Sequence, residues 1–268
     1  MINVMKMDLY RMFRSKSTYL ILLGILTFVG ILLYTMRDSI EMPNVGVTIG
    51  ITTNTDGLRS STDLTTLFKI MASSNSFLIG IVIFSVMFIN REEASGFTKN
   101  IVGQVTSKGL LVLSKFVSQC VFIVLSFIGS LFIFFFIGNV IFDSVSLGNS
   151  FDLIKETSLQ FIFHVAFAAI VLGLITLIQQ PVVSMLIGIL LTFGGFSYLY
   201  QMINNIIHGM TGNETFDLMN YTVTGIVPSI SGTSPVASII RGIAVSFVFI
   251  VLMLTYSVTT KQKRDVNG

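Results

Sequence analysis

The chain has 268 residues, of which 53% are hydrophobic and 11% are charged, with a formal net charge of +3. Its mean hydropathy is +0.85. A water-soluble globular domain carries roughly 25% charged residues, so this chain has too few to cover a water-facing surface. The sequence predicts an all-α membrane protein with several crossings. Its one cysteine, Cys120, excludes an intramolecular disulfide and a cysteine-based zinc site.

The basic stretch at the start of the chain has the spacing that an amphipathic helix on a membrane surface needs. Apolar side chains recur there at helical spacing, at Val4, Met5, Leu9, Met12 and Phe13. Basic residues between them suit a surface of anionic lipid headgroups. The apolar run that follows is long enough to cross a membrane and has no small-residue cleavage site, so an uncleaved first membrane helix is expected.

Six segments meet or nearly meet the requirement of about 20 mostly apolar residues for a membrane-crossing helix. They are 19–36, 71–90, 116–142, 157–178, 182–203 and 236–259, and none has a charged residue at its centre. Only three residues separate the fourth from the fifth, which predicts a tight hairpin with Pro181 starting a helix. Gly194 and Gly195 hint at a bend in the fifth segment, and short interfacial or re-entrant helices are expected within 204–235.

Small residues at four-residue spacing predict close approach of helices at two places. The two sets are Ala72, Ser76 and Gly80 in the second segment, and Ser184 and Gly188 in the fifth. Spacing alone leaves open whether the close neighbour belongs to the same chain or to a second subunit.

The distribution of basic residues predicts the orientation. With six crossings, 11 of the 16 Lys and Arg residues fall on the side of the two termini, and five fall on the other side. Because positive residues concentrate in cytoplasmic loops, both termini are expected in the cytoplasm, with the protein in the plasma membrane.

Segment 91–116 is unusually polar for a stretch between two apolar runs. Phe97, Ile101 and Val105 recur every four residues within it, which predicts a short amphipathic helix. A second helix is expected to begin near Ser107 and to continue past Lys115 into the third crossing. The segment is either a solvated loop whose charges fix the topology or a docking helix gripped by another protein. The apolar stripe favours the docking helix.

These features together resemble the type-2 ABC transporter permeases, and in particular the small six-span exporter permeases of peptide, bacteriocin or antibiotic export and immunity. The resemblance covers the basic amphipathic start, the loop order and the short hairpin between the fourth and fifth crossings. Within the polar segment it rests on Glu92, Glu93, Gly96, Lys99, Asn100, Ser107, Lys108 and Lys115. The proline that the family commonly has before the Ser-basic pair is replaced here by Val105-Thr106.

The resemblance implies six transmembrane helices, an N-terminal interfacial helix and a cytoplasmic coupling helix that fits a groove in an ATP-binding subunit. The coupling residues would be Glu92, Glu93, Gly96, Phe97, Lys99, Asn100, Ile101, Gln104, Ser107 and Lys108. Two permeases, identical or related, would sit over two ABC ATP-binding subunits that hold ATP and Mg. The export of peptides or of amphipathic antimicrobial compounds is the implied activity.

The chain itself has no G-x-x-x-x-G-K-[ST] phosphate-binding loop. We therefore expect it to bind no cofactor and no metal, to have no enzymatic activity of its own, and to contact lipid but no nucleic acid.

Two other classes of function remain as alternatives. An autonomous secondary transporter or channel usually relies on acidic residues inside the membrane, and the sequence places none at mid-depth. An intramembrane enzyme ranks last, because H-E-x-x-H, G-x-S-x-G and a pair of membrane aspartates are all missing. His164, the ionisable residue well inside a predicted span, is a functional candidate for that reason. The favoured expectation is a neutral histidine bonded to a neighbouring helix; Gln160 lies one turn before it, and Gln119 and Asn139 are polar candidates on adjacent helices.

Overall fold

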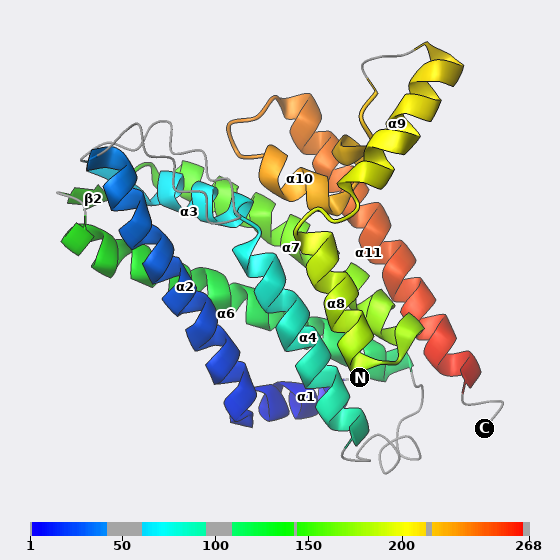
Figure 1. Cartoon of the computed structure of the whole chain (residues 1–268). Coiled ribbons are helices and arrows are strands. Elements are labelled where there is room, and N and C mark those ends of the chain that lie inside the picture. The colour runs from blue at the N-terminus through cyan, green and yellow to red at the C-terminus, as the bar shows by residue number, and fades with distance from the viewer. Residues whose placement is uncertain (1, 42–60, 95–108, 142–143, 213–215, 265–268) are drawn as a thin grey trace.

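A computed structural model describes residues 2–41, 61–94, 109–141, 144–212 and 216–264, and these residues are almost all helical (Figure 1). The helices are α1 (Ile2–Arg14), α2 (Lys16–Glu41), α3 (Leu64–Ser73), α4 (Ser76–Ala94), α6 (Gly109–Ile141), α7 (Ser150–Ile178), α8 (Pro181–Thr192), α9 (Ser197–Thr211), the 3-10 helix η1 (Leu218–Tyr221), α10 (Val223–Ser229) and α11 (Val236–Arg264). Two short strands, β1 (Ser61–Asp63) and β2 (Ser144–Ser146), pair in parallel.

Among the described residues, four helices are long and apolar enough to cross a membrane: α2, α6, α7 and α11. The pairs α3–α4 and α8–α9 also qualify if each bent pair counts as one crossing, which gives up to six crossings by length and composition. Large apolar side chains are exposed on the outside of these helices, as expected for helices that face lipid: Phe247 of α11 is 66% exposed and Phe136 of α6 is 64% exposed. The prediction of an all-α, membrane-type chain is confirmed at this level.

Two of the segments expected as single crossings are broken in the structure. The predicted segment 71–90 contains the junction of α3 and α4, and 182–203 contains the junction of α8 and α9; each pair is bent by 59°. Asn75 at the first junction has a φ of 61°, and Gly194 at the second has a φ of 68°. Asparagine and glycine tolerate this left-handed conformation better than other residues, so both breaks have a local cause.

The turn between α7 and α8 follows the predicted hairpin. Gln179 ends α7 in the left-handed conformation, and Pro181 occupies the first turn of α8. The expected short helices between the fifth and last crossings are also present, as the end of α9, η1 and α10.

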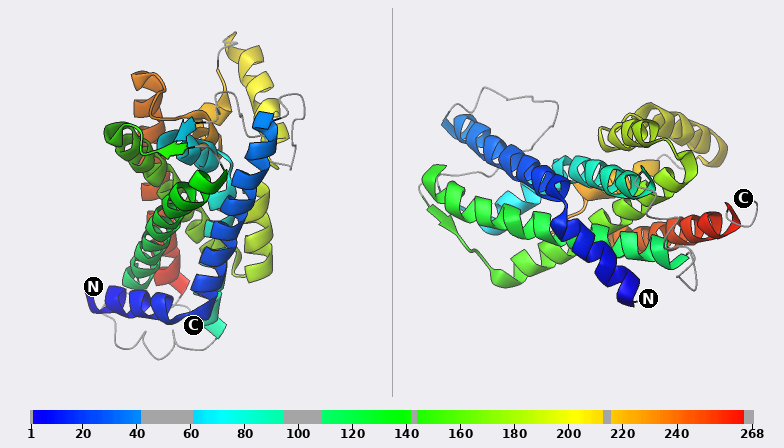
Figure 2. Two further views of the ribbon diagram at one scale, coloured as in Figure 1. Left: turned by 90° about the vertical axis from the view of Figure 1, so that its left-hand side faces the viewer. Right: turned by 90° about the horizontal axis from the view of Figure 1, so that it is seen from below.

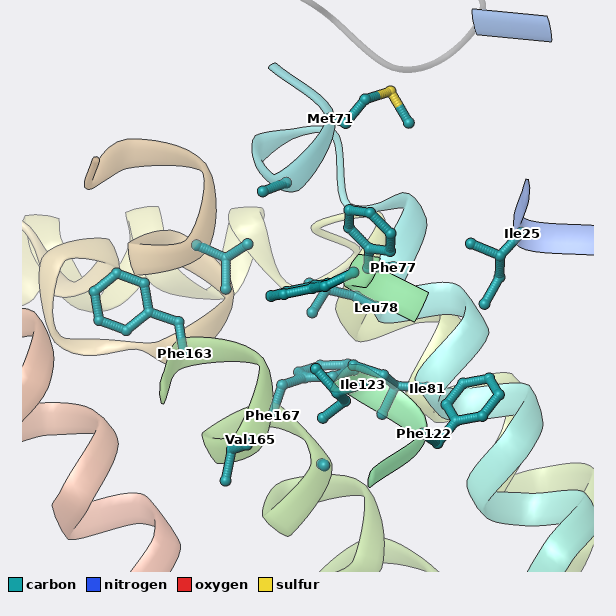
Figure 3. Packing of buried hydrophobic residues seen from close by; sticks show 14 of the residues in the cluster. Ile25, Met71, Phe77, Leu78, Ile81, Phe122, Ile123, Phe163, Val165 and Phe167 are labelled. Atoms are coloured by element: carbon teal, nitrogen blue, oxygen red, sulfur yellow. The ribbon is translucent and has the colours of Figure 1, made fainter. Parts of the chain in front are cut away.

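Aromatic side chains of α4, α6 and α7 lie at the centre of the core (Figure 3), together with Phe68 of α3. The Phe127 ring meets the rings of Phe68 and Phe77 edge-on, with centroids 5.0 Å away in both pairs. Phe84 of α4 stacks on Phe122 of α6 with centroids 4.0 Å apart. These contacts hold α4 in the interior, between α2, α6, α7 and α8.

Two of the predicted small-residue contacts lie within this chain. A Cβ added at Gly80 of α4 would collide with Ile25 of α2, and one added at Gly188 of α8 would lie 2.7 Å from Cγ1 of Val82 in α4. The close neighbours left open by the sequence are therefore helices of the same chain at these positions.

Candidate functional site: a buried ionic cluster beside α1

Three elements meet where α1 lies crosswise at one end of the long helices (Figures 1 and 2). The last turns of α4 and the first turns of α6 reach the same place. Asp8 of α1, Glu92 of α4 and Lys115 of α6 are all buried there, with exposed fractions of 0%, 1% and 8%.

Glu92 lies at the centre of the contacts. Its Oε1 accepts a hydrogen bond of 2.8 Å from Nζ of Lys115, and its Oε2 accepts one of 2.7 Å from Nη1 of Arg11. Arg11 is also 3.2 Å from Oδ1 of Asp8, and the hydroxyl of Ser114 donates to Oδ2 of Asp8. We call Asp8, Arg11, Glu92, Ser114 and Lys115 the ionic cluster.

The charges of the ionic cluster balance, with two carboxylates against two cations. Burial raises the pKa of Asp8 above its ordinary value, and the charge of Lys115 and the hydrogen bond from Ser114 oppose that rise. Buried charges of this kind are stabilised only while each keeps its partner, since an uncompensated charge in the interior is costly. The ionic cluster therefore ties α1, α4 and α6 to one another.

Among the ten predicted coupling residues, only Glu92 is described in full, and it is buried. It consequently faces α1 and α6, with its side chain inside the protein. Glu93 lies in the last turn of α4, and its side chain is not among the described ones. The other eight lie outside the described residues: Gly96, Phe97, Lys99, Asn100, Ile101, Gln104, Ser107 and Lys108.

The helix expected to begin near Ser107 is α6, which begins at Gly109 in the described part of the chain and continues through Lys115 without a break. Lys115 lies six residues into a 33-residue helix. At a rise of 1.5 Å per residue that helix is about 50 Å long, longer than the hydrocarbon core of about 30 Å. The lysine is therefore near one end of a helix that exceeds a single crossing.

Sequence reasoning missed Asp8, Arg11 and Ser114 as members of this cluster. A signal for Asp8 was present, because it falls four residues after Val4 and four before Met12, on the apolar stripe of the predicted first helix. An acid on a buried face needs a partner. No local feature marks Ser114, which is one of several serines in an apolar helix.

A second polar group lies on α7 at the opposite end of the molecule. Glu156 accepts a hydrogen bond from the backbone N–H of Gly232, and Gln160 donates to the carbonyl of Ile230 at 3.1 Å. Glu156 is only 2% exposed, although the sequence placed it just outside the fourth crossing. Glu156, Gln160 and His164 recur every four residues on α7, and we call them the α7 polar row.

His164 differs from its prediction. Its Nδ1 lies 2.7 Å from the carbonyl oxygen of Gln160 in its own helix, so the expected bond to a neighbouring helix is wrong for that nitrogen. The candidate partners are engaged elsewhere: Gln119 donates to Ser85, and Asn139 donates to Phe135. Helix α7 supplies the nearest carbonyl because a side chain reaches back toward the residue four positions earlier.

The rings of Phe77 and Phe127 pack edge-on against the His164 ring at 5.8 and 5.1 Å. Within the described part of the chain, Nε2 of His164 and Oε1 of Gln160 have no hydrogen-bond partner. The α7 polar row is thus buried, and two of its polar atoms lack hydrogen bonds to the described residues.

The described helices define an all-α chain of membrane type. The ionic cluster lies at one end of the helices, and the α7 polar row lies toward the other. No protein-family model matches the chain, and no curated protein matches it either. The assignment of function therefore rests on the residues themselves.

Proposed function

We propose that this chain is the membrane-spanning subunit of an ATP-driven ABC exporter, working as a pair over two separate ATP-binding subunits. The ionic cluster is the observation that carries the proposal. It joins the helices on either side of segment 95–108, because Glu92 of α4 precedes that segment, Lys115 of α6 follows it, and their side chains are 2.8 Å apart. A force applied to that segment by a partner would reach α4 and α6 together.

Arg11 of α1 also binds Glu92, so the ionic cluster connects α1 to α4 and α6. A displacement of segment 95–108 would therefore move the crosswise helix and two core helices as one body. Such a rigid connection is what a transport subunit needs if nucleotide binding elsewhere is to reorient its helices. The proposal takes the chain to cross the membrane six times with both termini in the cytoplasm and α1 at the interface. The segment would then lie beneath the membrane, where an ATPase could reach it.

The transported class follows from the resemblance to small exporter permeases. We propose peptides or amphipathic antimicrobial compounds, carried along a path formed by two permease subunits. Stimulation of ATP hydrolysis by a panel of peptides and lipids, measured on the purified complex, identifies the class.

The first test is copurification of ATPase activity with the tagged chain in mild detergent. Substitution of Glu92 is a poor probe of docking, because it disrupts the ionic cluster as well. The double variant Phe97→Asp/Ile101→Asp changes the predicted docking stripe and replaces no member of the ionic cluster. It should lose the ATP-hydrolysing partner while remaining in the membrane.

A matched control is Leu147→Asp, which adds an acid at an apolar position that is 60% exposed at the other end of the molecule. That variant should keep its partner. Retention of the ATPase by the double variant, or a wild-type chain that purifies without any ATPase activity, would contradict the proposal.

The α7 polar row favours a second candidate, an ion-coupled transporter or channel without an ATPase. Buried ionisable residues inside membrane helices commonly mark proton or ion paths. The discriminating measurement is proton or cation flux through the purified chain in sealed vesicles without ATP. Flux that Glu156→Gln abolishes would support this second candidate, and the absence of flux would count against it.

A further inference from the structure

A cavity of 340 Å³ opens between α1 and the end of α4, next to the ionic cluster. Its lining residues are Tyr10, Arg11, Arg14, Ser15, Phe88 and Arg91. Three of these six are arginines, and two carry hydroxyl groups. Its volume lies within the range of about 300–1,000 Å³ that small-molecule sites occupy. We call it the arginine pocket.

The three arginines differ in how their charges are compensated. Arg11 forms ion pairs with Asp8 and Glu92. Arg14 donates to the hydroxyl of Tyr10 at 2.8 Å, and Arg91 donates to the hydroxyls of Ser15 and Ser17 at 2.9 and 2.6 Å. In the described part of the chain neither of these two arginines has an ion pair with a carboxylate. Among the described residues, the hydrogen bonds of Arg14 and Arg91 therefore go to neutral hydroxyl oxygens and leave their positive charges without a carboxylate.

The location of the arginine pocket indicates the source of an anion. It lies beside α1, which crosses the end of the long helices (Figure 2). If those helices cross a membrane, the pocket is at the level of the lipid headgroups. Phe88 and the ring of Tyr10 supply an apolar wall, over which Arg11 and Arg14 lie at 5.8 and 5.9 Å. Basic pockets between membrane helices beside a headgroup layer are suited to anionic lipids.

We propose that the arginine pocket binds the phosphate group of an anionic phospholipid from the leaflet in which α1 lies. The guanidinium groups of Arg14 and Arg91 would donate to the phosphate oxygens, for which their planar geometry is well matched. A phosphate held in this way would join α1 to α4 beside the ionic cluster. This site goes beyond the transport function, and it requires only that α1 lies against a membrane.

The test uses the full-length chain in detergent and native mass spectrometry with phosphatidylglycerol or phosphatidylcholine. Wild-type protein should bind phosphatidylglycerol in preference to phosphatidylcholine. Arg14→Gln/Arg91→Gln should weaken phosphatidylglycerol binding by about tenfold or more, because charge-assisted hydrogen bonds are lost. The control Lys6→Gln/Lys16→Gln removes the same charge from exposed positions outside the pocket and should bind like the wild type.

A second variant distinguishes loss of lipid binding from loss of folding. Arg14→Lys/Arg91→Lys keeps the charge but cannot form bidentate contacts, so its affinity should fall between those of the wild type and the glutamine variant. Equal losses in the glutamine variant and the Lys6/Lys16 control would show general charge attraction and overturn the proposal. Binding of inorganic phosphate as tightly as the lipid would overturn the lipid as the source.

Discussion

Glu92 binds two cations from two different helices while almost entirely shielded from solvent. Each partner compensates part of the cost of removing the carboxylate from water, so the arrangement is stable only when complete. Glu92 therefore connects α4 to α1 and α6. A change there would alter packing before it altered any contact with another protein.

Substitution of Lys115 tests this connection directly. Lys115→Met should lower the free energy of unfolding by about 1.5–3 kcal/mol, because the buried carboxylate of Glu92 loses one charged hydrogen-bond donor and keeps Arg11. Denaturant titration in detergent micelles measures the change. The double variant Glu92→Gln/Lys115→Met should recover part of the loss, whereas Lys6→Met, an exposed lysine on α1, should be neutral. Equal stability of wild type and Lys115→Met would contradict the ionic cluster.

Because Asp8 is titratable, the contribution of the ionic cluster to stability depends on pH. Its pKa is raised by burial above the ordinary value of 3.8, so the folded protein binds this proton more tightly than the unfolded chain. The contribution of Asp8 to stability is therefore greatest at low pH and is lost as the pH rises through the folded pKa. Relative to Asp8→Asn, the wild type should gain thermal stability between about pH 7 and about pH 4. Parallel melting profiles of the two proteins would refute the raised pKa.

At the scale of elements, small residues let α4 lie closely against its neighbours. Gly80 brings it to α2, and Gly188 of α8 brings it to Val82. A β-branched valine offers few alternative rotamers, so the contact at Gly188 has little room to adjust.

Gly188→Ala should therefore push α8 away from α4 and cost about 1–3 kcal/mol, the usual range for overpacking. Gly24→Ala in α2 is the matched control, because a Cβ there meets nothing within 4 Å. Thermal unfolding in detergent should show a lower midpoint for Gly188→Ala only. Adding Val82→Ala should restore the midpoint if the steric contact is the cause.

For the whole molecule, the two polar groups lie at opposite ends of the helix bundle. The ionic cluster is beside α1, and the α7 polar row reaches Gly232, the residue between α10 and α11 (Figure 1). If the long helices cross a membrane, these ends face different compartments.

Cysteine labelling tests that arrangement in a Cys120→Ala background. Lys6→Cys near the first end and Leu147→Cys near the other should react with a membrane-impermeant maleimide from opposite sides of sealed vesicles. Position 6 should be the cytoplasmic one, because basic residues concentrate on the side of the termini. Labelling of both positions from one side would exclude this topology.

Much of the helical content was predictable because apolar runs, a proline at a helix start and a helical stripe are local signals. The hairpin at Gln179–Pro181 and the first helix are examples. The breaks at Asn75 and Gly194 were harder to place, since single residues of these types also occur inside uninterrupted helices. The coupling helix stays a prediction, because its core residues lie outside the described ones.

The sequence by itself determined that this chain is helical and apolar, because composition and the spacing of apolar residues act along the chain. It also marked segment 91–116 as exceptional. Only the tertiary structure decided that Glu92 is buried and joined to Arg11 and Lys115, which are 81 and 23 residues away. Such pairings depend on which helix ends come together, and many charges in the sequence could have been paired in other ways.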